Sequence, residues 1–96
     1  MYVAACRVTL HIAASRSLKD KRQVVRSLSE RLRRQFNVSV AEVDEQDVWQ
    51  TAVLGLAAVS NTAAHAETQL ERVLEEIERT RLDAELVDLQ RDVMHL

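Results

Sequence analysis

The 96-residue sequence contains no proline, one glycine (Gly55) and one cysteine (Cys6). With so little glycine and proline, its turns must be short and polar, made by Asp, Asn, Glu and Ser side chains that hydrogen-bond to the turn backbone. A single cysteine excludes an internal disulfide, and together with three scattered histidines it excludes a zinc site of the Cys/His type. We therefore expect one modest core with no metal and no cofactor.

Aromatic residues and long apolar runs are also scarce. Only Tyr2, Phe36 and Trp49 are aromatic, so the core must be built from Val, Leu, Ala and Ile. No apolar run reaches the roughly 18 residues of a membrane-spanning helix, and no signal-peptide pattern is present. Hydrophobic residues make up 47% and charged residues 29%, the balance of a globular chain. These features predict a single cytoplasmic domain over residues 1–96 that does not associate with a membrane.

The net charge of −2 conceals a strong asymmetry along the chain. Residues 1–36 carry nine basic and two acidic side chains, a net +7. Residues 37–96 carry four basic and thirteen acidic side chains, a net −9. A protein with its charges separated in this way can present a basic surface to an acidic partner in spite of its negative total.

Hydrophobic periodicity predicts six secondary-structure elements. Residues 2–12 alternate with period two, which predicts a strand whose even-numbered side chains are buried. Apolar residues at helical spacing predict one helix over residues 18–35, with Ser17 as its N-cap, and a second helix capped by residues 60–61. The remaining strands are predicted at residues 36–44, 48–59 and about 83–93.

Two of these strands contain an irregularity. Between Val40 and Val43 the alternation slips by one residue, and a β-bulge there would return Val43 to the buried side. In the last strand, Leu86 favours one inward register, whereas Val87 and Leu89 favour the other. The sequence therefore leaves the inward face of the last strand open.

The order of the elements, with the right-handed crossover rule, predicts an α+β fold of the ferredoxin-like βαββαβ type. In this fold, two helices cover one face of a four-stranded antiparallel sheet. The other sheet face would carry apolar side chains without a helix to cover them, which is typical of an interface. Trp49 would either anchor that interface or cap one end of the open face within the monomer. The candidate interface residues are Val3, Ala5, Trp49, Val53, Ala57 and Val59.

No set of residues favours catalysis. The acidic residues Glu42, Asp44, Glu45 and Asp47 could bind a divalent cation, but they lack the glycine and the spacing of a calcium loop. A solvated turn is the simpler interpretation. Cys6 lies on the buried side of its strand and is expected to be a small core residue rather than a nucleophile. The sequence therefore predicts neither catalytic residues nor metal ligands.

The first helix carries the clearest functional signal. Four cations gather around its beginning, where the helix dipole already favours anions, and two more follow over roughly 15 Å of a regular helix. No aromatic residue is interleaved with them, so contact with phosphates is expected rather than stacking on single-stranded bases. A solvated helix face is the alternative. The candidate anion- or nucleic-acid-binding residues are Arg16, Lys19, Lys21, Arg22, Arg26 and Arg33.

Four segments of the chain form a recognisable series: Ser15–Arg22 (SRSLKDKR), Phe36–Val43 (FNVSVAEV), Gln46–Gln50 (QDVWQ) and Leu54–Ala57 (LGLA). In this order they resemble the motifs of the YlxP-like family of small bacterial proteins, a domain of unknown function. The resemblance implies a ferredoxin-like fold and a cytoplasmic bacterial protein, and it supplies no catalytic residues to carry over to this chain. Genes of this family often lie beside those of transcription and translation factors, which implies a role connected with RNA or the ribosome.

Two functional hypotheses follow. The first is a non-enzymatic binding module that docks the basic helix on RNA or on a ribosomal surface. The alternative is a homo-oligomeric or protein-interaction module that uses the open apolar sheet face.

Overall fold

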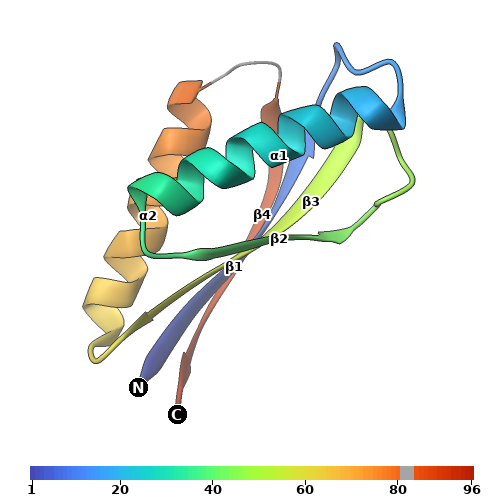
Figure 1. Ribbon diagram of the computed structural model, residues 1–96. Helices are drawn as coiled ribbons and strands as arrows, with labels where there is room; N and C mark the ends of the chain where they lie inside the picture. The colour runs from blue at the N-terminus through green and yellow to red at the C-terminus, as the bar shows by residue number, and fades with distance from the viewer. Residues whose placement is uncertain (81–83) are drawn as a thin grey trace.

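The computed structural model describes residues 1–80 and 84–96, and its elements follow the predicted βαββαβ order (Figure 1). The elements are β1 (Tyr2–His11), α1 (Leu18–Gln35), β2 (Ser39–Asp44), β3 (Thr51–Ser60), α2 (Ala63–Thr80) and β4 (Glu85–His95). The last strand was predicted to begin at about residue 83, which lies outside the described residues. The third strand was predicted from residue 48 but begins at Thr51, so residues 48–50 belong to the β2–β3 connection.

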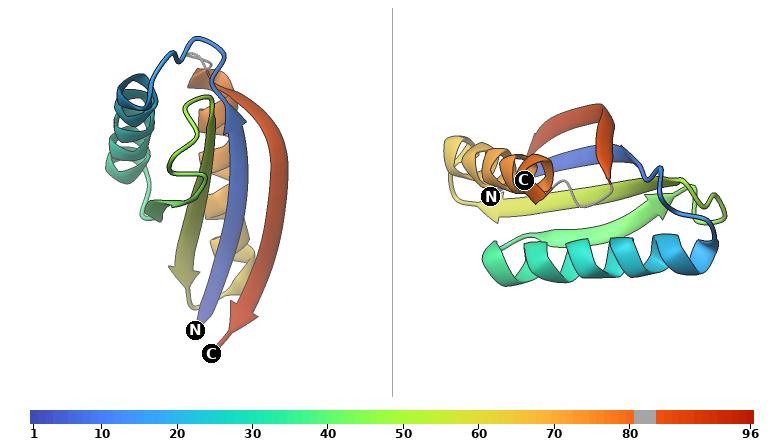
Figure 2. Two further views of the ribbon diagram at one scale, coloured as in Figure 1. Left: turned by 90° about the vertical axis from the view of Figure 1, so that its right-hand side faces the viewer. Right: turned by 90° about the horizontal axis from the view of Figure 1, so that it is seen from above.

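The four strands form one antiparallel sheet in the order β2-β3-β1-β4. From Ala4 onward the even-numbered residues of β1 are buried, as the alternation predicted, and so are their partners in β3. Both helices pack their apolar residues into the same core as these strand residues, which places both on one face of the sheet. Figure 2 shows α1 lying alongside β2, with α2 behind the central strands. The predicted α+β, ferredoxin-like architecture is confirmed.

A β-bulge resolves the ambiguous register of β4. The pairing of β1 with β4 shifts by one residue between Thr9 and Leu10, so that Leu10 pairs with Leu86 while Val8 pairs with Leu89. Since Leu10 and Val8 both face the helices, Leu86 and Leu89 do so as well. The register that Leu86 favoured therefore applies before the bulge in β4, and the register that Leu89 favoured applies after it.

The bulge predicted in β2 is present, between Glu42 and Asp44, but the predicted orientation of Val43 was wrong. Val43 is 49% exposed, and its Cγ1 lies 2.8 Å from the position that a Cβ on Gly55 would occupy. Gly55 pairs with Arg7, whose side chain is exposed on the face without helices. The bulge thus turns Val43 onto the open face because the missing side chain of Gly55 leaves space for it there.

The helix N-termini are capped by side chains. Ser17 Oγ accepts a hydrogen bond from the Asp20 backbone N–H (3.1 Å), and the Asp20 carboxylate accepts one from the Arg16 N–H (3.0 Å), which confirms the predicted cap. At α2 the prediction was one position too early. There the Thr62 hydroxyl accepts from the His65 N–H (3.2 Å). Neither helix in the described ranges is long and apolar enough to cross a membrane.

Candidate nucleic-acid interface

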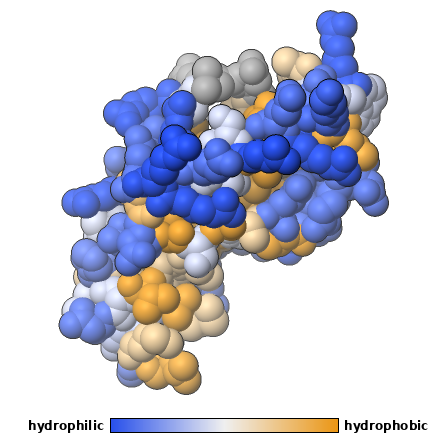
Figure 3. Space-filling model, viewed as in Figure 1, coloured by the Kyte–Doolittle hydropathy of each residue, from blue (hydrophilic) through white to orange (hydrophobic). Residues whose placement is uncertain are grey.

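A stripe of cations runs along the solvent side of α1. Lys19, Arg22, Arg26 and Arg33 are all exposed, and at 3.6 residues per turn they fall on one face of the helix over about 21 Å. None of these four takes part in an ion pair with any described residue. Figure 3 shows a nearly continuous hydrophilic surface over α1. We call this set of four residues the α1 stripe.

Arg33, at the far end of the α1 stripe, is partly occupied. Its Nη2 donates a hydrogen bond to the backbone carbonyl of Val40 (2.7 Å), which ties the last turns of α1 to β2. The Arg33 side chain is nevertheless exposed, and its other guanidinium N–H groups make no hydrogen bond to the described residues. Lys19, Arg22 and Arg26 make no side-chain hydrogen bond to the described residues, so they are the more available part of the stripe.

Lys21, predicted to belong to the anion-binding surface, is buried. Its side chain is fully inaccessible, and its Nζ donates to the backbone carbonyls of Glu45 (2.7 Å), Gln46 (3.2 Å) and Thr51 (3.2 Å). Its Nζ also lies 3.0 Å from the carboxylate of Glu42. The ammonium is therefore satisfied within the chain and is not available to an external anion, so the assignment of Lys21 to that surface was wrong.

The spacing along α1 explains the burial of Lys21. Lys21, Val25, Leu28 and Leu32 stand at i, i+4, i+7 and i+11, which is the stripe that faces the sheet. This periodicity is visible in the sequence and places a lysine at a core-facing position. The carbonyls that compensate its charge come from the β2–β3 connection and the start of β3. Nothing in the sequence indicated that this segment lies against α1.

The β2–β3 connection lies against the beginning of α1. The Ile12 N–H donates to the Gln50 carbonyl (2.8 Å), and the Gln50 side-chain amide donates to the carbonyls of Ala13 (3.4 Å) and Ser15 (3.3 Å). Figures 1 and 2 show residues 45–50 reaching the first turn of the helix. Trp49 is 48% exposed in this connection, one residue before Gln50. The fold therefore brings the tryptophan to the basic end of α1.

The predicted interface residues of β1 and β3 do share the open sheet face. Val3 pairs with Val59, Ala5 with Ala57, and Thr9 with Val53. Their exposure differs widely, however, because Val59 is 56% exposed whereas Val53 is only 4% exposed. Val53 is thus not available for contact with a partner.

The open face is also more polar than predicted. An ion pair joins Arg7 of β1 to Asp44 of β2 (2.6 Å) across this face, and β4 adds Asp88 and Asp92. A shallow hollow of about 490 Å³ lies around Gly55. These charged residues give the face three carboxylates against one guanidinium, which disfavours contact with nucleic acid there, so the α1 stripe remains the candidate surface for phosphates.

Of the four acidic residues near the β2–β3 connection, Glu42 and Asp44 pair with cations of the chain itself, whereas Glu45 and Asp47 make no ion pair with the described residues. Glu42 lies beside Lys21, and Asp44 pairs with Arg7 while it also accepts a hydrogen bond from the Glu45 N–H (2.8 Å). Glu45 has a positive φ of 56°, as in a tight turn. In residues 1–80 and 84–96, no three His, Cys, Asp or Glu side chains are placed to hold a metal ion.

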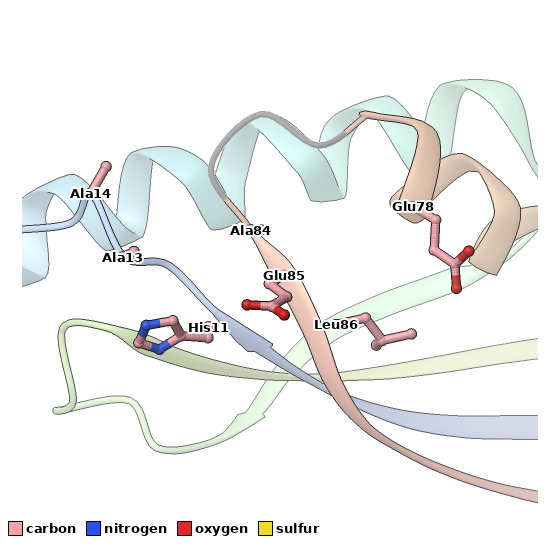
Figure 4. A pocket seen from close by; sticks show the side chains of 7 residues that line it. All are labelled: His11, Ala13, Ala14, Glu78, Ala84, Glu85 and Leu86. Carbon is pink, nitrogen blue, oxygen red and sulfur yellow. The ribbon is translucent and has the colours of Figure 1, made fainter.

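A hollow of about 630 Å³ lies between the end of β1, the end of α2 and the start of β4. Figure 4 shows that its polar side chains do not converge, because Glu78 lies at the opposite end from His11 and Glu85. This hollow therefore offers no catalytic constellation among the described residues.

Two buried titratable groups belong to the core and not to a site. Burial raises the pKa of the Cys6 thiol, which favours the unreactive protonated form. Glu76 of α2 accepts hydrogen bonds from Arg79 and Thr80, and the Arg79 hydrogen bond is the main reason that the pKa of Glu76 is lowered. Arg31 of α1 donates to the Thr80 hydroxyl (3.3 Å), so this cluster joins the two helices.

Comparison with known proteins assigns the chain to a family. Residues 3–91 match a family described as a protein of unknown function, DUF503. The chain belongs to this family. It is also 41% identical over 83 residues to the uncharacterized protein YlxP of Bacillus subtilis (strain 168), an alignment that covers 80% of this chain and 88% of that protein. The resemblance to the YlxP-like family is thereby confirmed.

The descriptions of the DUF503 family and of YlxP name no function. A functional proposal for this chain therefore rests on its surface residues. The matched residues span all six elements of the fold except the first residue of β1 and the end of β4. The α1 stripe and the β2–β3 connection, which carries Trp49, both lie within the matched residues 3–91.

Proposed function

We propose that this chain is a non-enzymatic binding module of the bacterial cytoplasm that docks α1 on the phosphate backbone of RNA, free or on the ribosome. The observation that carries this proposal is the α1 stripe: cations on one exposed helix face, without a carboxylate partner among the described residues. On a chain whose net charge is negative, such a stripe concentrates positive potential where an anion can approach.

Phosphate contacts of this kind predict affinity without sequence readout. Each phosphate that a cation neutralises releases counterions, so affinity falls as salt rises, with a slope of about −0.7 per contact on single strands. The three most available cations of the α1 stripe therefore predict a slope of about −2 in log K against log salt concentration.

Filter binding of ribosomal RNA and of 30S particles over a salt series tests the proposal. We expect binding at low salt that weakens with this slope, and we expect Arg22→Gln to reduce the magnitude of the slope by about 0.7, the share of one contact. Arg72→Gln is the matched control, because it removes the same charge from an exposed position on α2. Absence of binding at low salt, or binding that is insensitive to salt, contradicts the proposal.

A second candidate function, self-association, is favoured by one observation on the open face. Val43 and Val59 are about half exposed, and the shallow hollow around Gly55 lies on the same face. A second copy of the chain could cover these residues by sheet-on-sheet packing. Sedimentation equilibrium at high micromolar concentration should then show a dimer that Val59→Asp dissociates, whereas a monomer at that concentration excludes this candidate.

A further inference from the structure

We infer that Trp49 and the cations at the beginning of α1 form one site for single-stranded RNA, with a base stacked on the indole and the adjacent phosphates on Arg16, Lys19 and Arg22. This inference rests on the proposed function and specifies its ligand as an unpaired strand rather than a duplex. It departs from the expectation that no aromatic residue stands among the basic ones, because that expectation considered only neighbours in sequence.

The buried lysine holds both ends of the tryptophan-bearing connection. Lys21 Nζ holds the carbonyls of Glu45, Gln46 and Thr51, which bracket Trp49 in the chain. A surface loop held at both ends by one buried ammonium loses little conformational entropy when a ligand binds. Trp49 is therefore presented on a rigid support while about half of its surface stays accessible.

Gln50 ties this connection to the segment that leads into α1. Its side-chain amide bonds to the carbonyls of Ala13 and Ser15, and Arg16 follows Ser15 directly. Lys19 and Arg22 stand in the first turns of α1, with Arg22 next to the anchor Lys21. All three cations are exposed and lie outside the ion pairs of the described part of the chain. The tryptophan and the cations thus share one end of the molecule.

This end combines the two features that single-stranded nucleic acids require. Aromatic side chains accept the bases by stacking, and neighbouring cations follow the backbone, without selection of a sequence. The inference does not use the free amides of the helix, because the Asp20 N–H is already capped by Ser17. A duplex would keep its bases stacked within itself and would gain nothing from Trp49.

The other two aromatic residues are not available for this role. Tyr2 stacks on His95 at the far end of β1, with ring centroids 4.2 Å apart and an interplanar angle of 7°. Phe36 is half-buried against the core. Among the three aromatic residues, Trp49 is therefore the exposed one whose connection lies against the basic beginning of α1.

Because the chain has a single tryptophan, its tryptophan emission, excited where Tyr2 does not absorb, reports this site alone. The experiment titrates the protein with an oligouridylate of about ten nucleotides, a length within the usual site size. Two further ligands are titrated in parallel. One is the duplex that this strand forms with oligoadenylate, and the other is inorganic polyphosphate. Affinities are measured separately by fluorescence anisotropy of the labelled strands and by competition with polyphosphate.

We expect the single strand to quench Trp49 emission with saturation, and polyphosphate to bind without comparable quenching. Trp49→Ala should weaken single-strand affinity about tenfold, the loss expected for one stacked base. It should leave duplex affinity unchanged, and Trp49→Phe should restore most of the loss. Arg22→Gln should weaken binding of all three ligands. Melting curves of the variants verify that each is folded.

The outcomes separate this inference from the proposed function. If the single strand binds but neither changes Trp49 emission nor loses affinity in Trp49→Ala, stacking is refuted while phosphate binding by α1 stands. That result would leave Trp49 as the anchor of a protein interface. If no RNA binds at low salt, both the inference and the proposed function are overturned.

Discussion

Lys21 occupies a position where a lysine is seldom found, fully buried between a helix and a sheet connection. Its ammonium is tolerated because three carbonyls and the Glu42 carboxylate replace the water it has lost. One oxygen of that carboxylate is buried and accepts no hydrogen bond, so the ammonium beside it supplies the compensating charge. The residue acts as a positioning group for the β2–β3 connection.

Replacing this lysine should be costly. Lys21→Met leaves Glu42 and three carbonyls without their cation, which predicts a loss of about 3–5 kcal/mol in the free energy of unfolding. Lys19→Met is the matched control, since Lys19 is exposed two positions away and its replacement should change stability by less than about 0.5 kcal/mol. Urea denaturation followed by circular dichroism measures both. Equal stability of the two variants would show that Lys21 is not a structural residue.

Glu76 is the second residue whose environment makes a prediction. In the folded protein its pKa lies below the ordinary value of 4.5, chiefly because of the hydrogen bond from Arg79. As pH falls, the unfolded chain therefore takes up this proton first, so the contribution of Glu76 is complete above pH 4.5 and is lost as pH falls through the lowered pKa.

Denaturation curves measured across this acidic range should show the effect. Wild-type stability should decline as pH falls, and Glu76→Gln should flatten that decline because the variant has no carboxylate to protonate. Glu75→Gln, at the adjacent exposed position, should retain the wild-type dependence. A Glu76→Gln curve that declines as steeply as the wild type would assign the acid sensitivity to other carboxylates.

Among the elements, β2 and β3 depend on each other at one point. The bulge of β2 turns Val43 over Gly55, and a Cβ on Gly55 would come within 2.8 Å of Val43 Cγ1. That distance requires Val43 to rotate or the strands to separate. The glycine of β3 and the bulge of β2 therefore form one structural unit.

This interdependence can be measured with a double-mutant cycle. Gly55→Ala should destabilise the protein by about 1 kcal/mol, the low end for an overpacked site, because Val43 is half exposed and can move. In a Val43→Ala background the same change should cost little, so the two effects should not add. Thermal or urea unfolding of the four proteins gives the coupling energy, and additive effects would mean that the two residues do not contact each other.

Seen as a whole, the molecule separates its charges between its two helices. The α1 stripe is exposed and basic, whereas the outer surface of α2 carries Glu67, Glu75 and Glu78. The chain should therefore bind a polyanion above its isoelectric point of about 5.9, where a uniform charge distribution would oppose binding.

Retention on immobilised heparin at pH 7 tests this separation. We expect retention at low salt and elution as salt screens the contacts, with earlier elution for Arg26→Gln than for Arg72→Gln. Both variants lose one positive charge, so only the position of that charge differs between them. Co-elution of the two variants would mean that net charge, and not the α1 stripe, governs retention.

Local patterns were enough to predict most of the architecture. The period-two alternation of β1, the Ser17 cap and the slip near Val43 report backbone conformations that depend on adjacent residues. The crossover rule then favoured the ferredoxin-like arrangement, which the structure confirms. The register of β4 could not be predicted, because a bulge reverses which alternate residues face the helices partway along the strand.

Charge and exposure at the candidate site were decided by contacts between distant segments. Counting charges placed Lys21 on the surface, but a carbonyl 24 residues further along the chain receives its ammonium and draws it inside. The same contacts carry Trp49 to the basic end of α1, although 33 positions separate it from Arg16 in the sequence. Periodicity reports which side of an element is buried, but the partner of a buried charge emerges only when the chain is folded, because Coulomb and hydrogen-bond energies depend on distance in space.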